Sequence, residues 1–138
     1  MLIRFAKLLL LGLLFSACFN GSEVQPSGPQ NKSVNNGSVL PLLGNDVIEQ
    51  VNRTSANITG RITELGRKPI LEHGHTWSTT SDPSNASMIT SLGERNNSGT
   101  FKSKLINLES DTEYHVRAYA ITVVGTVYGT TTTLRTNK

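Results

Sequence analysis

Two histidines near the middle of the chain have the spacing of a metal-binding pair. His73 and His75 are two residues apart in a stretch whose residue types favour a β-strand, so both side chains are expected on one face. Histidines at positions i and i+2 bind zinc when a third ligand converges on them. No recognised motif ties a carboxylate or a cysteine to this pair. The sequence therefore predicts no metal and no cofactor, and a metal- or ligand-dependent role for His73 and His75 is the weaker alternative.

The motifs of common catalytic sites are missing from the chain. It contains no G-x-S-x-G nucleophile turn and no glycine-rich loop of the phosphate-binding type. Asp46, Asp82 and Asp111 fall in predicted turns without a recognisable set of partners. We therefore expect no catalytic residues and a protein that is not an enzyme.

The one cysteine of the chain, Cys18, follows an apolar N-terminal segment. Two basic residues within the first seven positions precede an uninterrupted apolar run at residues 8–15 (LLLLGLLF), and Ser16 and Ala17 are small. This order is typical of a secretory signal peptide. A membrane-spanning helix needs about 20 apolar residues, which this run does not reach.

The residues Phe15-Ser16-Ala17-Cys18 resemble the bacterial lipobox, in which a large apolar residue and two small ones precede a lipidated cysteine. Phe15 stands where the lipobox usually has Leu. The alternative is a signal cleaved after Ala17 that leaves a free thiol, which has no evident use in an exported protein. The resemblance implies a signal peptide at residues 1–17 and acylation of Cys18, so that membrane lipid is a partner. It also implies a bacterial cell envelope location, expected at the outer membrane, with the side faced by the protein left open.

Residues 18–38 are expected to form the lipidated cysteine and a disordered tether. Gly, Ser, Asn, Pro and Gln dominate residues 20–38, and Val24 and Val34 are the only aliphatic residues there. No apolar face is available to offset the entropy lost on ordering. About 20 residues of this kind span roughly 25 Å root-mean-square, which suits a spacer.

The charge balance argues against a nucleic-acid partner. The formal net charge is +3, but without Arg4 and Lys7 only 11 basic residues face 10 acidic ones. A chain this close to neutral has no strong electrostatic reason to bind phosphate or an anionic surface.

From residue 39 onward, apolar and polar residues alternate as in half-buried β-strands. Alternate residues from Ala56 to Ile62 are apolar or small, and the residues between them are polar. The predicted strands are 54–64, 70–79, 99–106, 114–122 and 128–136, with a short edge segment around residues 88–92. Turn residues separate them, and no stretch sustains helical periodicity. The pattern predicts one all-β domain at residues 39–138, an antiparallel β-sandwich of about seven strands.

Residues 108–129 (LESDTEYHVRAYAITVVGTVYG) resemble the C-terminal half of a fibronectin type III domain, in the version common in envelope proteins of Bacteroidetes-type bacteria. The matching residues are Leu108, Thr112, Tyr114, the run 116–120, Gly125-Thr126 and Tyr128-Gly129, with 74–79, Asp82-Pro83 and 99–101 upstream. The resemblance covers about residues 54–136 and implies an immunoglobulin-like sandwich. The chain departs from it at His75, where an aliphatic residue is usual, and in having no cysteine pair between the sheets.

Tyr114 is expected to form a tyrosine corner, in which its hydroxyl bonds to nearby backbone. If Trp77 faces inward, His75 becomes a partly buried neutral histidine. The predicted core consists of Ile58, Ile62, Trp77, Phe101, Leu105, Leu108, Tyr114 and Val116.

Arg117, Tyr119, Val123 and Tyr128 are the candidate binding residues. Tyr119 and Tyr128 are expected to be exposed, and Arg117 shares the strand face of Tyr119. Such an Arg–Tyr stripe is either a contact surface or, more commonly, a cross-strand cation–π pair.

Val123 and Val124 occupy a predicted hairpin tip, where Gly, Asn or Asp is usual. Two explanations compete. In the preferred one, the strand 114–122 runs further and Val124 faces inward, so that only Val123 is exposed. In the other, the tip is an apolar contact point on a loop that this architecture uses for recognition.

Three functions are compatible with the sequence. The first is a non-enzymatic envelope lipoprotein that presents one binding or spacer module in adhesion, envelope assembly or polysaccharide handling. The second is a structural accessory subunit of a larger envelope complex, and the third is the histidine-dependent lipoprotein. The expected partner is an envelope protein or polysaccharide.

Overall fold

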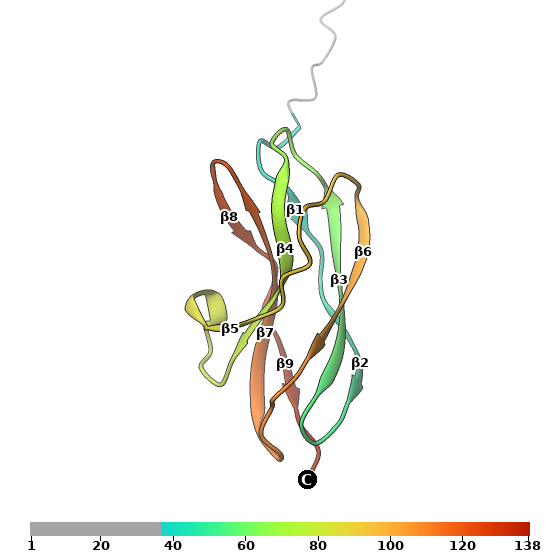
Figure 1. The fold of residues 1–138 in the computed structure, drawn as a ribbon, viewed down its shortest axis with the longest axis vertical. Coiled ribbons are helices and arrows are strands. Elements are labelled where there is room, and N and C mark those ends of the chain that lie inside the picture. Colours follow the sequence, from blue (N-terminus) through green and yellow to red (C-terminus); the bar gives the residue numbers. More distant parts are fainter. Residues whose placement is uncertain (1–36) are drawn as a thin grey trace, which may run out of the picture. The chain divides into compact units, whose positions relative to one another are not determined.

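A computed structural model of the chain describes residues 37–138 (Figure 1). The predicted signal peptide at 1–17, the lipidation site Cys18 and nearly all of the predicted tether lie outside the described residues. The predicted boundaries at 17 and 38 therefore stay predictions.

The first sheet is built around β3 (Ala56–Glu64). Along one edge it pairs with β6 (Gly99–Leu105). Along the other edge it pairs with β1 (Leu42–Leu43) near its end and with β2 (Val47–Val51) near its start. All of these pairings are antiparallel.

The second sheet is built around β4 (Ile70–Ser78) and β7 (Glu113–Thr122), which pair over most of their length. A short strand, β5 (Met88–Ile89), lies beyond β4. The outer edge of β7 carries β8 (Gly125–Tyr128) and β9 (Thr132–Arg135) in succession. In Figure 1 the two sheets lie in separate layers, which confirms the predicted antiparallel sandwich.

The described residues form nine strands where the sequence predicted about seven, because each sheet has one interrupted edge strand. Residues 44–46 separate β1 from β2, and residues 129–131 separate β8 from β9. Each pair follows a single edge of its neighbour, so counting each pair as one strand restores seven.

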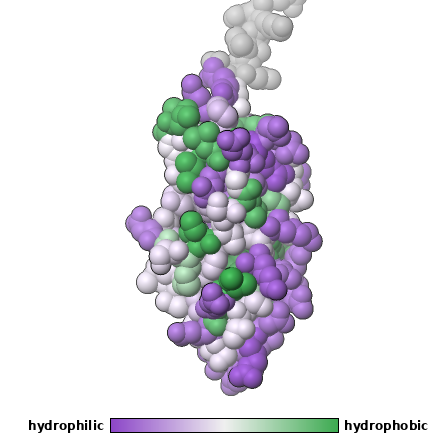
Figure 2. Space-filling view, in the orientation of Figure 1, coloured by the Kyte–Doolittle hydropathy of each residue, from purple (hydrophilic) through white to green (hydrophobic). Residues whose placement is uncertain are grey.

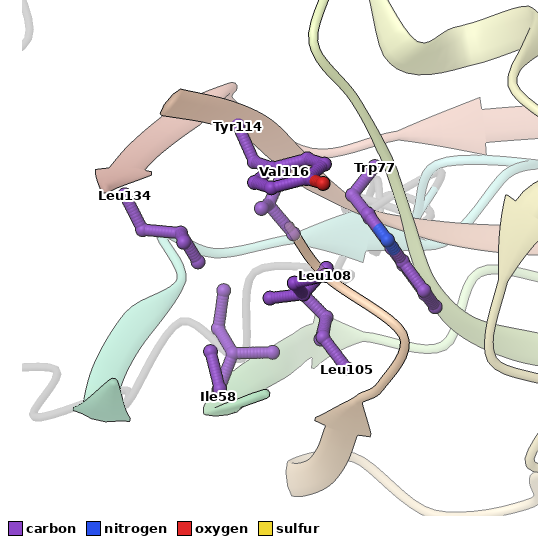
Figure 3. Close-up of a cluster of buried hydrophobic side chains, with 8 residues drawn as sticks. Ile58, Trp77, Leu105, Leu108, Tyr114, Val116 and Leu134 are labelled. Carbon is purple, nitrogen blue, oxygen red and sulfur yellow. The ribbon is translucent and has the colours of Figure 1, made fainter. Parts of the chain in front are cut away.

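Alternate side chains point into the space between the sheets, as the period-two pattern predicted. All eight predicted core residues are buried. One cluster contains Ile58, Trp77, Leu105, Leu108, Tyr114, Val116, Ala56 and Leu134 (Figure 3). A second cluster contains Ile62, Ile70, Phe101, Ala118 and Ala120. The predicted tyrosine corner is confirmed, because the Tyr114 hydroxyl accepts a hydrogen bond from the Glu109 N–H at 3.0 Å.

The chain enters the domain at the end that carries the β3–β4 and β7–β8 turns (Figure 1). The Arg67 N–H donates to the carbonyls of Ser38 and Val39 at 3.1 and 3.2 Å. Gly66 has φ +72°, and a Cβ there would lie 2.6–2.7 Å from the Leu40 carbonyl group. Only glycine therefore lets the entering chain pack against this turn. We call the residues 38–42, 65–71, 92–96 and 122–125 the entry end.

Helix is nearly absent from the described part of the chain. It contains one 3₁₀ turn, η1 (Pro83–Asn85), and no helix with the length and apolar character needed to cross a membrane.

Candidate interaction surface

The two histidines of the H-x-H pair have separate, internal partners. The His75 ring is fully buried, with Nδ1 2.7 Å from the Ser103 hydroxyl and Nε2 3.5 Å from Asp46 Oδ1. Asp46 Oδ2 accepts a hydrogen bond from the Ala118 N–H at 2.9 Å. This burial is more complete than the partly buried histidine that the sequence predicted.

The hydrogen bonds around His75 fit one consistent direction. The Thr90 hydroxyl accepts from the His75 N–H at 2.9 Å and lies 2.9 Å from the Ser103 hydroxyl. If Thr90 donates to Ser103 and Ser103 donates to Nδ1, the ring proton of a neutral His75 is on Nε2 and points at Asp46. The 3.5 Å contact is not a hydrogen bond, so His75 Nε2 and Asp46 Oδ1 are buried without a hydrogen-bond partner among the described residues.

Ser103, His75 and Asp46 are the residue types of an acyl-transfer triad, but they are enclosed in the core. Their side chains lie between the sheets, and the three residues are no more than 8% exposed. A nucleophile must reach its substrate, and this serine does not. The cluster instead connects β6 of one sheet to β4 and β7 of the other.

His73 is also occupied by its own surroundings. Its Nδ1–H donates to the Gly93 carbonyl at 2.8 Å, and its Nε2 faces Arg95 Nη1 at 3.5 Å. Burial is the main cause that lowers the pKa of His73, and the Arg95 guanidinium lowers it further. Residues 37–138 contain no group of three His, Cys, Asp or Glu side chains arranged to hold a metal ion.

Two of the four candidate binding residues line a small pocket on the outer face of the second sheet. The pocket has a volume of about 130 Å³, below the 300–1,000 Å³ of typical small-molecule sites. Its lining residues are Glu72, Thr76, Ser84, Ile89, Tyr119, Ile121, Thr126 and Tyr128. The Tyr128 hydroxyl donates to the Ser84 carbonyl at 2.9 Å, which ties β8 to η1.

Arg117 lies beside this pocket and makes the cation–π pair that the sequence favoured. Its guanidinium carbon is 4.8 Å from the ring centroid of Tyr128, so the partner is Tyr128 and not Tyr119. Its nitrogens also donate to the Ser84 hydroxyl at 2.9 Å and to the Gly129 carbonyl at 3.1 Å. The donors of Arg117 are therefore largely used within the domain.

The expected exposure of Tyr119 is wrong, whereas that of Tyr128 is confirmed. Tyr119 is only 4% exposed, and Tyr128 is 37% exposed. The segment that follows β5 packs on the outer face of the sheet, where the Tyr119 hydroxyl lies 2.7 Å from a Glu72 carboxylate oxygen and 2.9 Å from the Thr90 carbonyl. Burial and the Glu72 carboxylate raise the pKa of Tyr119 far above its ordinary value.

The preferred explanation of the Val123-Val124 tip is also wrong. Strand β7 ends at Thr122, and Val123 and Val124 form a two-residue turn in which they are 63% and 55% exposed. Gly125 takes φ +145°, and neither valine has positive φ. The Thr122 hydroxyl accepts from the Val124 N–H and donates to the Gly125 carbonyl, at 3.3 and 2.9 Å. Glycine and threonine thus supply what the turn needs, and the valines remain free to point outward.

Most of the exposed large apolar side chains gather at the entry end. Six of the ten in the described residues lie there: Val39, Leu42, Leu71, Leu92, Val123 and Val124, which we call the entry-end patch. Figure 2 shows apolar atoms concentrated over this end, mixed with hydrophilic ones. Apart from Val123 and Val124, the sequence did not indicate these residues as a surface, because each looks like an ordinary strand or loop residue until the turns bring them together.

Solved structures with a similar fold are two-sheet sandwiches. The sensor domain of the anti-sigma factor RsgI4 of Pseudobacteroides cellulosolvens is 14% identical with a TM-score of 0.57, over 70% of this chain and 94% of that one. The chicken CNTN1 FN1–FN3 domains are 18% identical with a TM-score of 0.51, over 73% of this chain and 33% of that one. A fibronectin type III domain of human collagen XX is 22% identical with a TM-score of 0.49, over 72% and 94%.

The strand order and the similarity to the RsgI4 and CNTN1 structures define the fold as a fibronectin type III sandwich. All three identities are below 25%, so the likeness concerns the fold alone. No protein-family model and no curated protein matches the chain. A shared fold does not by itself assign a function.

Proposed function

We propose that the protein is a non-enzymatic envelope lipoprotein that presents one fibronectin type III-like domain as a binding or spacer module. The observation that carries this proposal is where the polar and the apolar side chains lie. The Ser, His and Asp side chains are enclosed in the core, whereas exposed apolar side chains collect at one end of the sandwich. This arrangement suits a spacer or a binding module.

The lipid anchor rests on the sequence around Cys18. A basic start, an apolar run and Phe15-Ser16-Ala17-Cys18 support cleavage before Cys18 and its acylation. Each buried CH₂ contributes about 0.8 kcal/mol, so several acyl chains make anchoring effectively permanent. The proposed location is the bacterial cell envelope, at the outer membrane, with an envelope protein or polysaccharide as the further partner.

The anchor is tested by fractionation of cells that express the Cys18→Ser variant. We expect the wild type in the detergent phase and the variant in the soluble fraction, or retained as an unprocessed precursor. Detergent partitioning that is the same in both proteins contradicts the lipoprotein proposal.

Protease treatment of intact cells then determines which class of partner is available. A C-terminally tagged copy that is degraded on whole cells faces the outside, where surface polysaccharides and neighbouring cells are within reach. A protected copy faces the periplasm, and an envelope protein becomes the expected partner. Cross-linking of the wild type, with purification through the tag, then identifies that protein.

A further inference from the structure

The position at which the chain enters the domain has a geometric consequence for an anchored protein. Ser38 is twenty residues further along the chain than Cys18, and at about 3.5 Å per residue this stretch reaches at most about 70 Å. Ser38 is held against the β3–β4 turn by the Arg67 N–H. The β7–β8 turn is at the same end, because Ile70 pairs with Thr122. If Cys18 is acylated, the entry end is therefore the end of the domain at which the tether to the lipid is attached.

The chemistry of the entry end differs from that of the opposite end. The entry-end patch places six apolar side chains there, whereas at the opposite end only Ile106 is a large exposed apolar side chain among the described residues. The far end therefore has little exposed apolar surface, and its charges are mixed: Glu109, Asp111 and Glu113 lie there with Arg53, Lys104, Arg135 and Lys138.

Cationic side chains accompany the apolar ones. Arg67 and Lys68 are exposed on the β3–β4 turn, and neither has a carboxylate partner among residues 37–138. Arg95 adds a third positive charge, bonded to the Thr100 carbonyl and over the Phe101 ring. Two carboxylates, Glu64 and Glu94, belong to the same end, so the local excess of positive charge is small. Exposed apolar side chains beside lysine and arginine are the combination that suits a bilayer interface, where apolar groups enter the acyl boundary and cations meet phosphate.

We propose that the entry-end patch docks on the lipid surface, with Val123 and Val124 at the acyl boundary and Arg67 and Lys68 at the headgroups. The inference rests on the proposed anchor at Cys18. A two-valine tip binds weakly by itself, but a tether of this length holds the tip at a high effective concentration near the bilayer. Docking orients the domain with the end that carries Ile106 directed away from the membrane.

The test uses the lone cysteine to impose the anchor in vitro. The chain from residue 18 onward is coupled through Cys18 to vesicles that contain a maleimide lipid in a phosphatidylethanolamine and phosphatidylglycerol mixture. Two variants each add one tryptophan, Val123→Trp at the entry end and Ile106→Trp at the far end. Trp77 is buried in both, and the coupled wild type supplies its background. Quenching by brominated acyl chains reports contact with the bilayer interior.

We expect quenching of the added tryptophan to be at least threefold stronger at 123 than at 106. When the Val123→Trp protein also carries Arg67→Glu and Lys68→Glu, most of that difference should be lost. Equal quenching at both positions, or none at either, overturns the proposal. Quenching of the tryptophan at 123 that changes neither with added salt nor with the charge reversals overturns the headgroup contact. If sedimentation shows a dimer that Val124→Asp abolishes, a second copy of the chain occupies the entry-end patch. That result also overturns the proposal. Since coupling replaces cellular acylation, these results are independent of the Cys18→Ser fractionation.

Discussion

Asp46 Oδ2 lies 2.9 Å from the backbone nitrogen of Ala118, and this bond fills a gap in the second sheet. Ala118 falls where β8 has ended and β9 has not begun, so its N–H has no strand partner there. Asp46 reaches it from the break between β1 and β2. The interruptions of the two edge strands are therefore coupled through one side chain.

Asp46→Ala is expected to destabilise the domain by about 1–3 kcal/mol, because it leaves the Ala118 N–H buried without an acceptor. Urea unfolding monitored by Trp77 fluorescence gives the loss. Glu94→Ala is the control, because that side chain is exposed on a loop and its removal is expected to matter little. A similar small effect at both positions would show that the buried bond contributes nothing.

Gly60→Ala is expected to cost about 1–3 kcal/mol through overpacking. A Cβ at this position would lie 2.5 Å from the Phe101 ring and 2.8 Å from His75 Nε2. The matched control is Gly129→Ala, whose Cβ would meet its nearest atoms at an ordinary 3.5 Å. Thermal unfolding of the two variants should differ clearly, and equal melting temperatures contradict the packing described for His75.

Tyr114→Phe is expected to destabilise by about 1–3 kcal/mol, because the Glu109 N–H loses its acceptor. Tyr119→Phe should also be costly, since the Tyr119 hydroxyl is buried beside Glu72 and Thr90. The appropriate reference is Tyr128→Phe, at a partly exposed residue. A Tyr128→Phe loss as large as the other two in urea unfolding would contradict this ranking.

Val124→Asp is expected to change the free energy of unfolding by no more than about 0.5 kcal/mol, as is usual for exposed sites. Thr122→Val at the neighbouring position should cost about 1–2 kcal/mol, because the Val124 N–H and the Gly125 carbonyl lose their common partner. If Val124→Asp is the more damaging of the two, the turn is not as described.

Lower pH is expected to weaken the domain through His73. Its folded pKa is below the ordinary 6.5, mainly because of burial, so the unfolded chain binds the proton more readily. Stability is therefore lost as pH falls through about 6.5, until the folded pKa is also passed. The free-energy gap between wild type and His73→Gln should narrow from pH 7.5 to pH 5.5. A gap that widens over this range has the wrong sign for a buried neutral histidine.

The sandwich and its core could be predicted because every second residue of a half-buried strand faces the core and is apolar or small. Ala56 to Ile62 and Tyr114 to Ala120 are examples, and the corner at Tyr114 follows from its place after Leu108. The burial of Tyr119 could not be predicted, because the segment around Thr90 after β5 covers a sheet face that the alternating pattern assigns to solvent. For Val124, strand parity was misleading because the turn is determined by Thr122 and Gly125. The Asp46–His75–Ser103 cluster could not be predicted, because it joins residues up to 57 positions apart in the sequence. Its one signal was Gly60, a glycine inside a strand, where a Cβ would collide with the rings of Phe101 and His75.

If the proposed lipid anchor is correct, the interrupted edge strands affect how densely copies of the domain can be held on one membrane. A long, flat, unpaired strand edge invites another chain to add to the sheet, and tethering to a surface raises the local concentration at which this happens. Here β1/β2 and β8/β9 are broken, β5 has two residues, and β6 carries exposed Lys102 and Lys104. Each of the four edges thus lacks a continuous neutral template. A crowded layer of these domains is expected to stay monomeric and free of β-aggregates.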